Sequence, residues 1–325
     1  MAKKETQCCE TKFKTSCGGQ ALMEGIMMQG PDKRAIVVRK PDGTLDVTTS
    51  DIKRRTGWKA WPLIRGVFIF CSSMVNGVKA LLHSAEVSGD ESFAQDEELT
   101  GLDKWLSEHF EDEKANSIII TIAAVLGVLF SVALFILLPT AITGLIGLFW
   151  KTMPLWFRAV LEGIIKVAVF LTYLGLVSKM KEIRRVFQYH GAEHKTIYCY
   201  ENDMELTVEN VRLQGRHHPR CGTSFLFVVI VVSIFLSIVI FTPLGIKNTL
   251  LRMLLHLVLL PIICGVTYEF NRYVGAHENG LCRALRAPGM WMQNFTTFEP
   301  DDSMIEVAIA ALKEVLPENE GEDRW

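Results

Sequence analysis

The chain has 325 residues, of which 49% are apolar, and its mean hydropathy is +0.23. The formal net charge of −2 gives no indication of nucleic-acid binding. The apolar residues are concentrated in long runs, so the predicted fold class is mainly α. We expect a helical multi-pass membrane protein with about four transmembrane helices and a cytoplasmic α+β portion that contains a β-hairpin.

The N-terminal part is predicted to lie in the cytoplasm. Residues 1–16 are polar and are expected to be disordered, whereas residues 17–115 form a region with some structure. Within that region, alternating β-branched residues flank Lys40-Pro41-Asp42-Gly43. This pattern is typical of a β-hairpin, here over residues 34–49.

The segment 58–86 is predicted to be an interfacial or re-entrant helix. Trp58 and Trp61 stand among lysines and arginines, which is typical of a membrane interface, and a largely apolar run follows. The alternative is a helix that only covers the cytoplasmic domain. Residues 86–117 are acidic and predict a solvated linker with a short helix at 102–110.

Four apolar runs predict transmembrane helices, two within residues 116–178 and two within residues 223–270. The runs are 118–138, 157–177, 223–242 and 250–268. Pro139 is expected to end or kink the first. The second contains Glu162 and Lys166, four residues apart, which indicates either a structural ion pair or a proton or ion pathway.

The distribution of lysine and arginine predicts the orientation. The segment between the second and third runs is rich in these residues, and the other two links carry few. Residues 179–222 therefore form a cytoplasmic His-rich loop, and both termini lie in the cytoplasm. We expect the protein in the cell (cytoplasmic) membrane, with its eight cysteines reduced.

This loop contains the pattern H-x-x-E-H at His190, Glu193 and His194. An apolar stripe at helical spacing predicts a helix here, and two histidines four residues apart share one face of it. Such a pair predicts a site for a divalent metal, with Zn²⁺ as the expected ion and Glu193 as a catalytic general base. The alternative is that both histidines are satisfied core residues.

A catalytic zinc needs a third protein ligand. His217, His218 and Cys221 follow the motif closely, and Glu269 lies further along the chain at a spacing that resembles that of inverzincin peptidases. Glu24, a lone acid among apolar neighbours in a glycine-rich stretch, is a second candidate catalytic carboxylate. The residues that follow the fourth run are expected at the same membrane level as the His-rich loop.

The C-terminal segment, 271–325, is predicted to be cytoplasmic. Asp301 and Asp302 are suitable caps for an amphipathic helix that ends before Pro317.

Four motifs carry a resemblance to a known family. They are GGQALMEGIMMQGP at 18–31, YHGAEHKTI at 189–197, HPRCGTSF at 218–225, and PGMWMQNFTTFEPDD followed by EVAIAAL within 288–312. The chain resembles the YqhQ family of bacterial membrane proteins. The resemblance implies a multi-pass membrane protein that is a predicted metal-dependent enzyme, without a defined activity. The family motifs correspond to Glu24, His190, Glu193, His194, His218 and Cys221.

Three functional hypotheses follow. The first is a metal-dependent, hydrolytic enzyme with a cytoplasm-facing site at the membrane surface. The second is a non-catalytic scaffold or assembly factor that docks cytoplasmic or membrane protein partners. The third is a transporter, which ranks last because the first and third runs are uncharged. The expected partners are the lipid bilayer and, as open hypotheses, a second copy of the chain or another protein, but not nucleic acid.

Overall fold

The computed structural model describes residues 11–52, 56–89, 122, 125–319 and 321–324, which fall into two compact units. Unit 1 comprises residues 1–89, 174–228 and 264–325, and unit 2 comprises residues 90–173 and 229–263. The predicted helix at 102–110 and residues 1–10 of the predicted disordered N-terminus lie outside the described residues.

Residues 11–16 are part of the fold of unit 1. Thr15 is buried, its backbone N–H donates to Glu201 Oε1 over 2.8 Å, and it forms a β-bridge with Arg324. The prediction of disorder is therefore wrong for this segment, because a tertiary contact that the local sequence does not reveal holds it in place.

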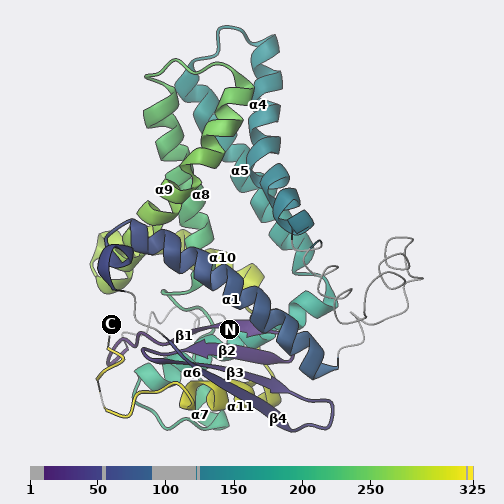
Figure 1. The fold of residues 1–325 in the computed structure, drawn as a ribbon, viewed down its shortest axis with the longest axis vertical. Coiled ribbons are helices and arrows are strands. Elements are labelled where there is room, and N and C mark those ends of the chain that lie inside the picture. The colour runs from purple at the N-terminus through teal and green to yellow at the C-terminus, as the bar shows by residue number, and fades with distance from the viewer. Residues whose placement is uncertain (1–10, 53–55, 90–121, 123–124, 320, 325) are drawn as a thin grey trace, which may run out of the picture. The chain divides into compact units, whose positions relative to one another are not determined.

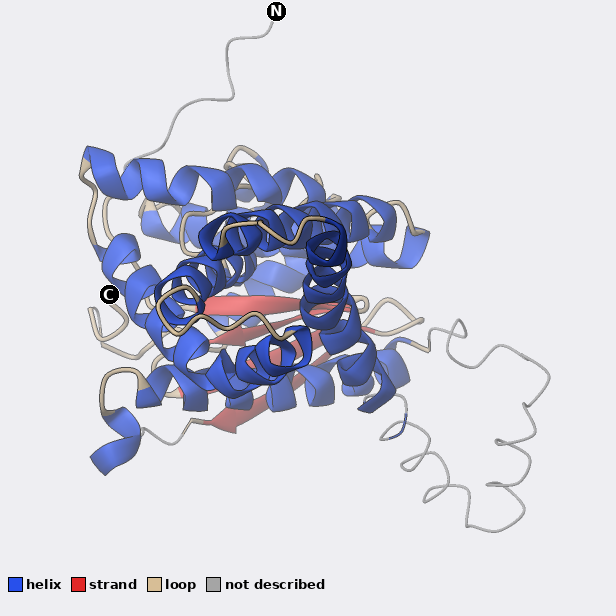
Figure 2. Cartoon of the chain, turned by 90° about the horizontal axis from the view of Figure 1, so that it is seen from above, coloured by secondary structure: helices blue, strands red, loops and turns tan. Residues whose placement is uncertain are grey.

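Unit 1 contains one antiparallel sheet whose four strands lie side by side in chain order (Figures 1 and 2). The strands are β1 (Gly18–Leu22), β2 (Gly25–Gln29), β3 (Lys33–Arg39) and β4 (Leu45–Asp51). β3 and β4 form the predicted hairpin, which is confirmed. The sequence does not identify β1 and β2, because their glycines lower the strand propensity. Leu22 pairs with Gly25, so Met23 and Glu24 form the turn, and Glu24 has φ +47°.

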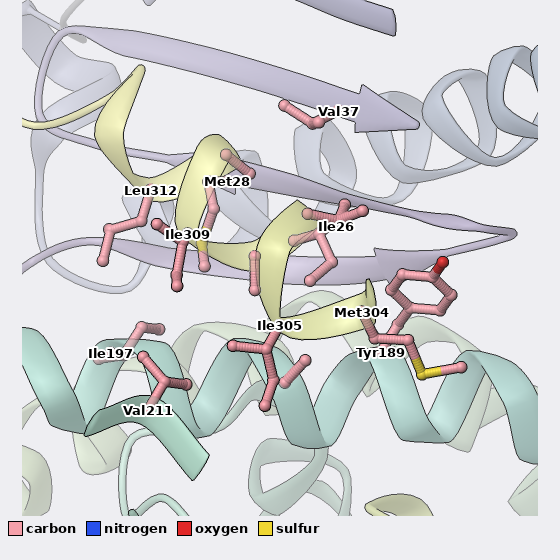
Figure 3. Close-up of a cluster of buried hydrophobic side chains, with 14 of the residues drawn as sticks. Ile26, Met28, Val37, Tyr189, Ile197, Val211, Met304, Ile305, Ile309 and Leu312 are labelled. Carbon is pink, nitrogen blue, oxygen red and sulfur yellow. The ribbon is translucent and has the colours of Figure 1, made fainter. Parts of the chain in front are cut away.

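One face of the sheet packs on helices α6 (Lys181–Glu201) and α11 (Asp302–Lys313) (Figure 3). Alternate residues of β2 and β3 point to these helices, as the period of a strand requires. The shared core includes Ile26, Met28, Val37, Tyr189, Ile197, Met304, Ile305, Ile309 and Leu312. Burial of each large side chain contributes about 1.5–3 kcal/mol. α11 occupies the position of the expected amphipathic helix, and the Asp301 side chain accepts the Met304 N–H at its start.

The predicted His-rich loop is mostly helical. α6 covers about half of it, and a short helix, α7 (Val208–Arg212), follows. Gly191 is required inside α6 because a Cβ at that position would collide with the carbonyl group of Phe298. The chain between α10 (Gly280–Thr296) and α11 therefore crosses α6 directly over the histidine motif.

The opposite face of the sheet is covered by α1 (Ile64–Ser88), which follows a short 3₁₀ turn, η1 (Gly57–Ala60). Small residues along one side of α1 allow the close approach: Gly77, Ala80 and Ser84 are buried, and Ala80 packs with Leu22 and Met27. The other side of α1 exposes apolar residues, among them Met74, Val75 and Val78.

Among the residues that the structure describes, four helices are long and apolar enough to cross a membrane, which makes the chain a helical multi-pass membrane protein. They are Ile64–Ser88, Val125–Phe149, Leu155–Val177 and Thr249–Ala276. The last three include α4 (Leu138–Phe149), α5 (Leu155–Val177) and α9 (Thr249–Ala276). The third predicted run forms α8 (Gly222–Phe241). Its apolar part, Phe225–Phe241, is shorter than the four helices above.

The first predicted run does not end at Pro139. A π-helical turn, η3 (Ala133–Leu137), precedes the proline, and the Leu138 N–H bonds to the Ala133 carbonyl. The wider turn accommodates a residue that cannot donate a backbone hydrogen bond, so the helix continues to Phe149. α9 likewise extends past the predicted end at residue 268, and it therefore contains Glu269.

Candidate metal centre

α6 places His190 and His194 one turn apart on a buried face. Their ring centroids are 4.4 Å apart, and the two residues are 9% and 1% exposed. This is the arrangement that the spacing of the motif predicts. The face is buried because β1, α11 and the segment around Phe298 pack on α6.

Cys221 completes a group of three ligand atoms. It lies immediately before α8, and its Sγ is 3.2 Å from His190 Nε2. One ligand atom from each of His190, His194 and Cys221 lies within 4.8 Å of the other two. Two imidazole nitrogens and one thiol can hold a metal ion of borderline softness such as Zn²⁺.

Backbone carbonyl groups orient both rings. The Nδ1–H of His190 donates to the Thr296 carbonyl over 2.8 Å, and that of His194 donates to the Arg216 carbonyl over 2.5 Å. Nδ1 of each ring therefore carries a proton, and Nε2 is the nitrogen that would bind a metal, once it has no proton, as in other metal-binding histidines. His194 Nε2 is buried and has no hydrogen-bond partner among the described residues.

The charges in the group favour a thiolate. Burial alone would raise the pKa of the Cys221 thiol, but His190 and His194 hold it well below its ordinary value. Burial would lower the pKa of His190, but Cys221 and Glu193 raise it to about 9. The deprotonated sulfur is the form that binds metals.

Glu193 lies beside this group and bridges α6 and β1. Its Oε1 accepts the Gly19 N–H over 2.8 Å, whereas its Oε2 is buried without a hydrogen-bond partner among the described residues. A Cβ at Gly19 would lie 3.2 Å from the Glu193 carboxyl carbon, so a glycine in β1 permits this approach. One carboxylate oxygen is thus anchored and the other is available.

His218 adjoins the three residues but has a different set of contacts. Its ring centroid is 5.6 Å from that of His194, and its Nε2 is 3.4 Å from Glu201 Oε2. Burial lowers the pKa of His218 to about 3, so its ring is neutral. Glu201 also pairs with Arg220, and Gln293 bonds to both backbone polar groups of His218.

Two predicted carboxylates lie elsewhere. Glu24 Oε2 accepts from Arg185 over 2.7 Å and from the Tyr189 hydroxyl over 3.1 Å, in the turn between β1 and β2. Glu269 forms an ion pair with Arg65 of α1, with Arg65 Nε 2.7 Å from Glu269 Oε1. The structure does not bring Glu269 to the histidines, because its carboxylate is already occupied by a guanidinium. His217 is also outside the three-residue group.

Several contributors are absent from the sequence-based prediction. The carbonyl groups of Thr296 and Arg216 leave no signal in the sequence, since any residue supplies a carbonyl. Glu201 and Gln293 are polar residues in helical segments, and only the structure shows that both are fully buried beside His218.

The comparisons with known proteins give a family without an assigned activity. Residues 61–318 match the family described as "Protein of unknown function (DUF1385)". The chain is also 34% identical over 321 residues to the "Uncharacterized protein YqhQ" of Bacillus subtilis (strain 168), covering 94% of this chain and 93% of that protein. No solved structure matches the chain significantly. The match over most of the chain shows that the protein belongs to the DUF1385 family, to which the YqhQ resemblance also points.

Proposed function

We propose that the protein is a metal-dependent hydrolase of the cell membrane in which His190, His194 and Cys221 bind one Zn²⁺ ion. The observation that carries this proposal is the buried Nε2 of His194, which has no hydrogen-bond partner among the described residues although His194 adjoins His190 and Cys221. A buried polar atom without a partner is costly, and a metal ion would satisfy it.

The donor set and its spacing support the proposal. Zinc bond lengths of about 2.0–2.3 Å imply ligand separations of about 3.4–3.6 Å in a tetrahedron. The ligand atoms lie within 4.8 Å of one another, so small side-chain rotations bring them to this range. Three protein ligands leave one position open, as in catalytic zinc sites.

When bound, the metal would supply a Lewis acid that polarises the scissile bond and acidifies water. Glu193 would then take the proton of the attacking water on Oε2 and pass it to the leaving group. The anchored Oε1 keeps the carboxylate oriented during this transfer, since Gly19 N–H holds it.

The proposed site lies on the cytoplasmic side of the membrane. The lysines and arginines between α5 and α8 favour a cytoplasmic unit 1 with both termini on that side. α1 would lie along the membrane surface, because one side of it covers the sheet while Met74, Val75 and Val78 are exposed on the other. A helix packed on a sheet with a polar exposed strand such as β4 is poorly suited to crossing hydrocarbon.

The test of catalysis separates metal binding from turnover. Glu193→Gln should retain the metal of the wild type and lose hydrolysis of ester, amide and phosphodiester substrates in a turnover screen. His194→Ala should lose both. His277→Ala and Cys71→Ser, at exposed positions outside the group, are matched controls that should change neither. Full turnover by Glu193→Gln would refute its role as the base.

A further inference from the structure

Unit 2 contains a group of buried charges that is separate from the metal-binding residues. Glu162 and Lys166 of α5, and Arg252 and His256 of α9, are all buried. Glu162 accepts hydrogen bonds from Thr140 Oγ1 over 2.7 Å and from Arg252 Nη2 over 2.9 Å, and it forms an ion pair with Lys166 Nζ over 3.2 Å. Both carboxylate oxygens of Glu162 therefore already have partners.

His256 does not supply the missing negative charge. Its Nδ1 is 2.9 Å from the Arg252 carbonyl, which can only accept, so Nδ1 carries a proton. Its Nε2 is 3.1 Å from Lys166 Nζ and 3.3 Å from Glu162 Oε1. Ser237 Oγ is 2.9 Å from the same Nε2 and 2.7 Å from the Ser233 carbonyl. A histidine ring is neutral or positive, so His256 adds no negative charge to the group.

The group then has an excess of positive charge. Lys166 and Arg252 contribute two cations, and Glu162 is the only acid in the part of unit 2 that the structure describes. A further buried cation, Arg158, donates to the Lys247 carbonyl over 2.7 Å and to Thr249 Oγ1 over 2.8 Å, and neither acceptor is charged.

Arg252 carries the clearest unmet requirement. It is 0% exposed, and its Nε and Nη1 have no hydrogen-bond partner among the described residues. The Phe241 ring lies 4.8 Å from the guanidinium carbon and supplies a cation–π contact, but it accepts no N–H in the plane of the guanidinium. A buried cation with unpaired donors within apolar helices is strongly unfavourable.

We propose that unit 2 binds one small monoanion of the chloride class against Nε or Nη1 of Arg252, where α5, α8 and α9 meet. An anion would balance the excess charge and satisfy a donor at once. A halide needs few donors and no fixed geometry. A phosphate or a lipid phosphate carries several acceptor oxygens, and two N–H groups cannot satisfy them.

Direct binding of radioactive chloride tests this proposal on the full-length protein in detergent. Gluconate, an anion too large for a packed helix interface, would keep the ionic strength constant. The expected result is saturable binding of about one chloride per chain, with a melting temperature that rises with chloride at constant ionic strength. Folded wild-type protein, with one symmetric peak in size-exclusion chromatography and no saturable chloride binding, would overturn the proposal.

Two variants and one control locate the site. Arg252→Gln should abolish chloride binding. Lys166→Met leaves Glu162 and Arg252 as a balanced pair, so its chloride affinity should fall at least tenfold. This variant keeps the proposal testable if Arg252→Gln does not fold. Arg65→Gln removes a cation from an ion pair of unit 1 and should leave binding unchanged. Unchanged affinity in folded Lys166→Met, or equal losses in all three variants, would contradict the assignment.

Discussion

Gly191→Ala is expected to destabilise unit 1 although alanine is the better helix former. The new Cβ would meet the carbonyl group of Phe298, a backbone atom that cannot rotate away. The Phe298 N–H is bonded to the Phe187 carbonyl over 3.0 Å, and the Thr296 carbonyl nearby receives the His190 N–H. The collision would therefore push apart two segments that hydrogen bonds on both sides hold together.

The magnitude follows from two opposing effects. Overpacking a rigid site costs about 1–3 kcal/mol, while replacing a helical glycine by alanine contributes about 1 kcal/mol in favour of folding. A collision with a backbone atom belongs to the upper part of this range, about 2–3 kcal/mol, so the net loss should be about 1–2 kcal/mol. The melting temperature should then fall by about 2–8 °C for a unit of this size. Metal affinity should fall as well, because His190 loses its orienting carbonyl.

Thermal unfolding of the detergent-solubilised protein, followed by tryptophan fluorescence, would measure this change. Gly175→Ala is the matched control, since Gly175 lies inside α5 and a Cβ there meets nothing within 4 Å. The control should be as stable as the wild type or more stable. If Gly191→Ala were equally stable, the close crossing of α6 by the segment before α11 would be refuted.

Three further predictions concern unit 1, and each is tested by thermal or chemical unfolding. Glu201→Gln should cost about 3–5 kcal/mol, because it removes the fully buried carboxylate that pairs with Arg220, and a loss below 1 kcal/mol would contradict the importance of this ion pair. Glu24→Gly should change stability by less than about 1 kcal/mol, whereas Glu24→Val should cost about 2 kcal/mol. The reason is that β-branched residues avoid the φ of +47° found at Glu24, so equal effects of the two substitutions would argue against that turn. Burial raises the pKa of the Cys17 thiol from 9.0 to about 11. The unfolded chain therefore loses this proton first, so stability that is complete below pH 9 should decline towards pH 11, and Cys17→Ala should remove this decline.

Local patterns predicted much of the fold. The β3–β4 hairpin follows from Pro41-Asp42-Gly43 between alternating residues, and the membrane helices follow from long apolar runs. Strands β1 and β2 are not predicted, because their glycines lower the strand propensity. Gly19 and Gly25 instead permit close contacts, with Glu193 and with β3 respectively. Helix ends were predicted less well, since the π-helical turn before Pro139 and the ion pair of Glu269 with Arg65 depend on neighbours.

The candidate site shows the same division. The spacing of His190 and His194 places both rings on one face of α6, and the sequence alone indicates this. Among the alternatives for the third ligand, the structure brings Cys221 to the two histidines, and His218 is held by Glu201 and Gln293. No local pattern distinguishes these outcomes, because they depend on how α10 packs against the end of the loop before α8.

The metal content of the purified protein tests the central claim most directly. We would purify the full-length chain in detergent without chelator and measure metals by mass spectrometry, beside His194→Ala, Cys221→Ser and the control Cys71→Ser. The account predicts close to one zinc per chain in the wild type and the control, and a loss of most of it in the two ligand variants. A well-folded wild type without stoichiometric metal, or full metal content in His194→Ala, would contradict the claim that these residues form a metal centre.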